Sequence, residues 1–127
     1  MTKEKITIEY NLNNASPNSV WGFISSPNGL ADWFADKVEC NGRTYTFYWS
    51  ASQQTARKTG LLNGVFIRFK WLEEEDPKAF FGFRINVDEL TNNVILEITD
   101  YAESDEKEDC VELWNKQVAT LKRRLGS

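Results

Sequence analysis

The C-terminal stretch of this chain reads SDEKEDCVELWNKQVATLKRRLG, from Ser104 to Gly126. Its apolar residues recur at steps of three and four, which places them on one face of a helix. They are Val111, Trp114, Val118, Leu121 and Leu125. Asp105 and Glu108 have the spacing of a capping box at the start, and Gly126 favours the end of the helix. We therefore predict one long terminal helix that buries these five side chains against a broad apolar surface.

The N-terminal part of the chain predicts one strand followed by two short helices. Residues 6–12 alternate apolar and polar side chains, as a strand with one buried face does. The alternation breaks at residues 13–15, and Ser16-Pro17 favours the start of a short helix. Residues 26–29 interrupt this helix, and the apolar spacing in residues 30–34 indicates a second one.

Between Lys37 and Ala102 the period of the apolar residues changes to two, which predicts six strands. These strands span residues 38–40, 43–49, 52–62, 65–71, 81–87 and 94–98. Asn41-Gly42 and Asn63-Gly64 are the strongest short hairpin signals in the chain. Short turns of this kind join antiparallel neighbours, so the sequence predicts an antiparallel sheet.

The order of elements predicts the fold class. A twisted antiparallel sheet curls around its apolar face, and the terminal helix can fill the concave side. At 127 residues the chain has room for one sizeable core. We therefore predict a single α+β domain over residues 1–127: a strand, two short helices and six strands, wrapped as a curved sheet around a long C-terminal helix.

Two stretches of these elements carry recognisable motifs. The opening contains Ala15-Ser16-Pro17, Val20-Trp21 and Leu30-Ala31-Asp32-Trp33-Phe34, and the terminal helix contains Trp114, Val118, Leu121 and Leu125. Together with the order of elements, these motifs resemble the helix-grip proteins of the START-like (SRPBCC) superfamily, in the branch related to the heat-shock-protein-90 ATPase activator. This resemblance implies a cavity between the sheet and the helix for a small hydrophobic molecule, such as a lipid. For the chaperone-activator branch it implies a protein partner instead.

Composition restricts the chemistry that the chain can support. The chain has no histidine, which is the commonest general base near neutral pH and the commonest metal ligand. Two cysteines without histidine argue against a zinc site, and no glycine-rich phosphate loop is present. We therefore predict no catalytic residue, no metal and no cofactor. The formal net charge of −4 argues against nucleic acid as a partner.

The cellular compartment is also an expectation from the sequence. No stretch is long and apolar enough to span a bilayer, and the first residues lead into the strand pattern without an apolar signal segment. We therefore expect a cytoplasmic protein. In that reducing compartment Cys40 and Cys110 remain thiols, and a disulfide between them is the less favoured alternative.

Aromatic side chains share the inward phase of the predicted strands, and residues of the terminal helix face them. Concave sites for apolar ligands are lined in this way, with a few polar groups. The candidate cavity residues are Tyr45, Phe47, Trp49, Phe69, Trp71, Phe81, Phe83, Trp114 and Val118, and Trp21, Trp33 and Phe34 close one end. The alternative is that the same rings fill the core, which the dense packing of protein interiors favours slightly.

Three charged residues need separate consideration. Asp100 continues the inward register of the last strand and is a possible polar group of the cavity, with a raised pKa. The favoured interpretation places it at a strand end, in water or capping a turn. Asp32 is expected to be a solvated helix residue, and Arg84 is expected to face outward. The acidic runs at residues 73–76 and 103–109 are expected to be solvated, or to form a docking surface for a basic partner.

Three function classes are compatible with this sequence. The first, which we favour, is non-catalytic binding of a small hydrophobic ligand in the cavity. The second is an interaction protein, similar to a chaperone cofactor, with a filled core and an active surface. The third is a cyclase-like or hydrolase-like enzyme, which the residues support least because acid–base chemistry would depend on carboxylates such as Asp100 or Asp32.

Overall fold

A computed structural model of the chain describes residues 3–13 and 15–126. Met1, Thr2, Asn14 in the predicted break at residues 13–15, and Ser127 lie outside the described residues. The elements are β1 (Glu4–Leu12), α1 (Pro17–Ser25), α2 (Pro27–Leu30), β2 (Lys37–Asn41), β3 (Thr44–Trp49), β4 (Ser52–Leu62), β5 (Phe66–Trp71), β6 (Phe81–Val87), β7 (Val94–Ala102), the 3-10 turn η1 (Ser104–Glu106) and α3 (Lys107–Leu125). This order confirms the predicted α+β architecture.

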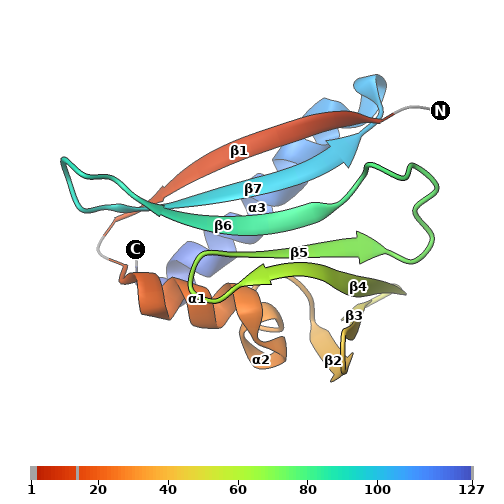
Figure 1. Cartoon of the computed structure of the whole chain (residues 1–127), viewed down its shortest axis with the longest axis horizontal. Coiled ribbons are helices and arrows are strands. Elements are labelled where there is room, and N and C mark those ends of the chain that lie inside the picture. Colours follow the sequence, from red (N-terminus) through yellow and green to blue (C-terminus); the bar gives the residue numbers. More distant parts are fainter. Residues whose placement is uncertain (1–2, 14, 127) are drawn as a thin grey trace.

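The strands form one sheet in the order β1-β7-β6-β5-β4-β3-β2, and every neighbouring pair is antiparallel. The hairpins connect β2 through β7 in sequence, while β1 pairs with β7 along its whole length. Helix α3 crosses one face of this twisted sheet behind β6 and β7, and α1 and α2 lie beside one end of it (Figure 1). None of the described helices combines the length and the apolar character that a membrane span requires.

Helix α3 confirms the predicted terminal helix, with two corrections. Trp114, Val118 and Leu121 are buried, but Val111 and Leu125 remain half-buried, so the apolar stripe is covered fully only in its middle. The predicted capping box is wrong, because no described side chain caps η1 or α3. The chain enters the helix through a 3-10 turn, which contains Asp105, whereas Glu108 lies in the first turn of α3. The predicted stop is confirmed: Gly126 is left-handed, at φ 76°.

The two short helices position the aromatic residues that follow them. Ser16 caps α1 by accepting a hydrogen bond from the Ser19 N–H at 3.1 Å. The second helix was predicted too late in the chain: α2 spans Pro27–Leu30, and residues 31–34 form turns. The reason is that Ser26 ends α1, as predicted, and at the same time caps α2, whose first residue is Pro27.

The predicted hairpins are present, and each turn differs from its prediction by one residue. In the second hairpin Leu62 pairs with Phe66, so the turn is Asn63-Gly64-Val65 and the strand begins at Phe66 rather than Val65. Gly64 has φ 81° in the turn between β4 and β5, a left-handed conformation that glycine adopts without steric cost. In the first hairpin Asn41 pairs with Thr44, so the turn residues are Gly42-Arg43 rather than Asn41-Gly42. The left-handed residue there is Gly42, at φ 64°.

Candidate functional site

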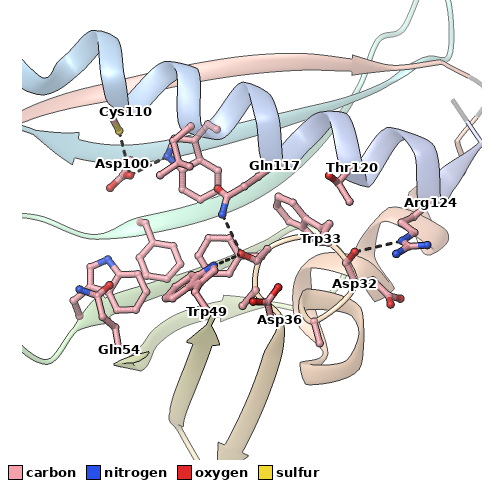
Figure 2. Close-up of a pocket in the computed structure, with 17 residues that line it drawn as sticks. Asp32, Trp33, Asp36, Trp49, Gln54, Asp100, Cys110, Gln117, Thr120 and Arg124 are labelled. Carbon is pink, nitrogen blue, oxygen red and sulfur yellow. Dashed lines mark hydrogen bonds between the residues drawn. The ribbon is translucent and has the colours of Figure 1, made fainter. Parts of the chain in front are cut away.

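A cleft of about 830 Å³ opens between α3, the segment 31–36 that follows α2, and the inner face of the sheet (Figure 2). Every residue of this segment lines the cleft. The sheet side contributes Trp49, Gln54, Trp71, Phe81 and Asp100. Helix α3 contributes Cys110, Leu113, Trp114, Gln117, Thr120 and Arg124. The cleft therefore has two structured walls and a third formed by a connecting segment.

The structure divides the predicted cavity residues into two groups. Those that border the cleft are Trp49, Trp71, Phe81 and Trp114, together with the polar candidate Asp100. Those that do not border it are Tyr45, Phe47, Phe69, Phe83 and Val118, which lie in the continuous core cluster. The second group is covered because rings from β3, β5 and β6 pack against one another there. Two of these contacts are Phe47 with Phe69 at 6.0 Å and Phe69 with Phe81 at 5.1 Å between ring centroids.

The aromatic wall of the cleft is built around Phe34. Its ring stacks on Trp114 at 5.5 Å and on Phe81 at 5.7 Å, and Trp71 stacks on Phe81 at 4.6 Å. The backbone oxygen of Phe34 accepts hydrogen bonds from Trp49 Nε1 at 2.9 Å and from Gln117 Nε2 at 3.0 Å (Figure 2). These bonds satisfy the polar edge of Trp49 and join β3 and α3 to the segment 31–36.

Asp100 is the deepest charged group of the cleft wall. Its Oδ2 accepts hydrogen bonds from Trp114 Nε1 at 2.9 Å and from Cys110 Sγ at 3.4 Å, and its Oδ1 accepts one from the Tyr101 backbone N–H at 2.8 Å. Burial raises the pKa of Asp100, and these hydrogen bonds together with the positive charge of Lys3 only partly offset that effect. The favoured sequence interpretation, a solvated strand end, is wrong because β7 continues to Ala102 and α3 covers this position.

Cys110 is held beside this carboxylate as a neutral thiol. Burial, followed by the negative charge of Asp100, raises the pKa of Cys110 to about 12. A protonated thiol is a poor nucleophile, so the pair lacks the activation that cysteine catalysis requires. Cys40 on the exposed strand β2 is the other free thiol, as the sequence predicted.

The opposite end of the cleft is polar and exposed. Arg124 Nε donates a hydrogen bond to the Asp32 backbone oxygen at 3.4 Å, which connects the end of α3 to the segment 31–36. Asp32 and Asp36 are exposed, as expected for Asp32. Figure 2 shows Asp100 at one end of the cleft and Asp32 with Arg124 at the other, with aromatic rings between them.

Sequence reasoning missed the residues of α3 that line the cleft beside Trp114, most of which are polar. Cys110, Leu113, Gln117, Thr120 and Arg124 recur at steps of three and four, parallel to the apolar stripe. This spacing was available as a signal, but a polar helix face is ordinarily a solvated face. Its position over the cleft depends on how α3 is rotated against the sheet.

A group of carboxylates outside the cleft is the one described place where acidic oxygens cluster closely. Glu103, Asp105 and Glu106 bring one oxygen each within 4.8 Å of one another at the start of η1. Acidic residues are favoured at helix starts by the dipole alone, and Asp105 and Glu106 are exposed. This group therefore carries no assignment.

Comparison with known proteins identifies the family. The START-like superfamily domain matches residues 1–127. This chain belongs to the START-like superfamily. A search of curated proteins returned no match. Among solved structures, BfR322 from Bacteroides fragilis is 46% identical to this START-like domain, with a TM-score of 0.68, and the alignment covers 98% of this chain and 92% of that one.

Two further solved structures are similar to this START-like domain in fold. The Aha1 dimer from Colwellia psychrerythraea has 18% identity and a TM-score of 0.78, with 96% of each chain covered. XoxI from Bacillus cereus has 15% identity and a TM-score of 0.75, with 98% of this chain and 96% of that one covered. At these identities the likeness concerns the fold alone.

Proposed function

We propose that this START-like domain binds a small, mostly apolar ligand without catalysis, in the cleft between the sheet and α3. The observation that carries this proposal is the cleft itself, about 830 Å³ in volume and walled by aromatic rings. Binding sites for small molecules have volumes of about 300–1,000 Å³, apolar walls and a few polar groups. The superfamily commonly binds hydrophobic ligands, which agrees with this function.

The rigidity of the wall supports the same proposal. The Phe34 ring stacks on Trp114 and Phe81, and the backbone oxygen of Phe34 accepts hydrogen bonds from Trp49 and Gln117. When the wall is already ordered before binding, the entropic cost of ordering its side chains does not reduce the affinity. The protonated thiol of Cys110 and the lack of histidine favour binding over catalysis.

The test uses an uncharged naphthalene probe, 2-(2-naphthyl)ethanol, titrated against tryptophan fluorescence. We expect saturable quenching, because Trp49, Trp71 and Trp114 border the cleft. Isothermal titration should also give a negative heat-capacity change, since apolar surface becomes buried. The melting temperature should rise with probe concentration, because the probe binds only the folded state.

A pair of variants on α3 makes this test specific. Leu113→Trp introduces a large ring at the cleft, and Leu113 is 58% exposed in the wild type, so folding should be little affected. We expect the probe to bind about tenfold more weakly to this variant. Ala119→Trp is the matched control on the exposed face, outside the cleft, and should bind the probe as the wild type does. Lack of saturable binding by the wild type would refute the proposed function.

The outer face of the sheet favours a protein-interaction function as the second candidate. The Arg68 guanidinium lies 4.7 Å from the Phe80 ring centroid, and the Arg84 guanidinium lies 4.9 Å from that of Phe66. Cations over half-buried rings would suit an acidic segment of a partner protein. Binding of an acidic, phenylalanine-containing peptide should weaken with salt and after Arg68→Ala. Equal binding of its lysine-substituted counterpart would contradict this function.

A further inference from the structure

The charge of the cleft points to one class of ligand, given that the cleft is a binding site at all. Its lining includes three carboxylates, Asp32, Asp36 and Asp100, against one guanidinium, that of Arg124. The ion pairs of the described residues involve other acids, namely Glu4, Glu39, Glu74 and Asp76. A ligand that enters the cleft therefore meets a surplus of unneutralised negative charge.

Asp100 concentrates this effect at the deep end. Its three hydrogen-bond donors are the indole of Trp114, the thiol of Cys110 and the Tyr101 backbone N–H, all of which are neutral. A carboxylate has about four acceptor sites, so Oδ1 keeps one site for a donor that enters from the cleft. The positive charge of Lys3 acts on Asp100, but Lys3 Nζ is already paired with Glu74 at 2.7 Å. Burying a carboxylate is costly, and a positively charged ligand group would relieve the part of that cost that Lys3 leaves. Burial of a carboxylate raises its pKa, and the pKa of Asp100 is raised mainly for this reason.

The rings of the wall add a second attraction for positive charge. Trp49 and Trp71 are half-buried and border the cleft, and the face of an indole is the strongest aromatic partner for a cation. Trp114 also borders the cleft, but its ring is covered by Phe34 and Phe83. Sites that combine aromatic faces with a carboxylate recognise organic ammonium groups, because the rings cover the apolar carbons while the acid binds the charge. An anionic ligand would face repulsion from Asp100 and gain little from Arg124, which lies at the other end of the cleft (Figure 2).

We propose that the ligand of this cleft is an apolar organic amine, whose ammonium group donates a hydrogen bond to Asp100 and whose apolar body lies against Trp49 and Trp71. This inference rests on the proposed function, because it names the chemical class of the ligand of that same site.

The test compares three probes that share a naphthalene ring: the cation 2-(2-naphthyl)ethylamine, the uncharged 2-(2-naphthyl)ethanol and the carboxylate 2-naphthaleneacetate. Titrations are run at neutral pH and physiological salt, so that attraction by distant surface charge is screened. We expect the amine to bind at least about tenfold more tightly than the alcohol. The acetate should bind no better than the alcohol.

Two variants assign the preference to one residue. Asp100→Asn should remove the preference for the amine, so that the amine and the alcohol bind to this variant with affinities within about twofold of each other. Asp109→Asn removes an exposed acid of α3 outside the cleft, so it controls for net charge and should leave the preference intact. If Asp100→Asn does not fold, the carboxyl ¹³C resonance of Asp100 in the wild type should shift on addition of the amine and not of the alcohol.

The outcomes separate the two proposals. Equal affinity for the amine and the alcohol would overturn the amine inference and leave the binding function standing. A preference for the amine that survives Asp100→Asn, or an unmoved Asp100 resonance, would overturn the role of this residue. Failure of all three probes to bind would refute the proposed function, and the amine inference with it.

Discussion

Replacing Trp114 with alanine removes the one tryptophan of α3, whose side chain is 4% exposed. Its ring stacks on Phe34 at 5.5 Å and meets Phe83 edge-on at 5.8 Å, and its Nε1 donates to Asp100 at 2.9 Å. Truncating a buried tryptophan to alanine costs about 3–5 kcal/mol of stability. Each aromatic pair contributes about 0.5–1.5 kcal/mol and a hydrogen bond to a charged group about 1.5–3 kcal/mol, so we expect a loss near the upper end.

The measurement is urea unfolding followed by circular dichroism, because the variant itself changes the tryptophan fluorescence. Leu113→Ala is the matched control: it is the preceding residue of the same helix and is 58% exposed, so its loss should stay within about 0.5 kcal/mol. A loss below about 1 kcal/mol for Trp114→Ala, the size expected of a surface substitution, would refute the reasoning that α3 is held to the sheet through this side chain.

The dependence of this loss on pH tests the hydrogen bond separately. The Trp114 indole lowers the pKa of Asp100, and its removal therefore raises that pKa further. The loss caused by Trp114→Ala should then be larger at about pH 7 than at about pH 4, because the hydrogen bond favours the ionised carboxylate, whose share grows as the pH rises. Equal losses at both values would mean that packing alone accounts for the effect.

Three further outcomes are expected. Because the pKa of Asp100 is raised on folding, this group stabilises the fold at low pH, and that contribution is lost as the pH rises from about 4 through the raised pKa. The urea midpoint of the wild type should therefore fall over this pH range, and Asp100→Asn should reduce the fall. An Asp100→Asn variant with the same pH profile as the wild type would contradict this prediction. An aromatic disulfide reagent at mildly alkaline pH should modify Cys40 rapidly and Cys110 slowly, because the pKa of Cys110 is raised to about 12, and Cys40→Ser should leave only the slow phase. A Cβ at Gly29 would lie 2.0 Å from the Gly22 backbone oxygen, so Gly29→Ala should lower the free energy of unfolding in urea by at least about 1–3 kcal/mol. Gly22→Ala is the control. Its Cβ would meet no described atom within 4 Å, so this variant should be neutral or slightly stabilising.

The sequence alone determined the elements and their order. Local backbone geometry sets the apolar period to about two in strands and about 3.6 in helices, so β1 and α3 could be predicted from spacing alone. Turn residues act over equally short distances, and Gly64 and Gly126 adopt the left-handed conformations that their positions indicated. The misplaced second helix shows the limit of such signals, because Ser26-Pro27 can either break a helix or start one.

Only the tertiary structure decided which inward residues border the cleft. Phe47 and Trp49 share one face of β3, yet Phe47 is fully buried in the core and Trp49 lies at the cleft. The same holds for Asp100, whose inward register left open whether α3 or water would cover it. A periodic pattern records which face of an element a side chain occupies. It does not show which part of that face a second element covers, because the covering residues are far apart in the sequence and only folding brings them together.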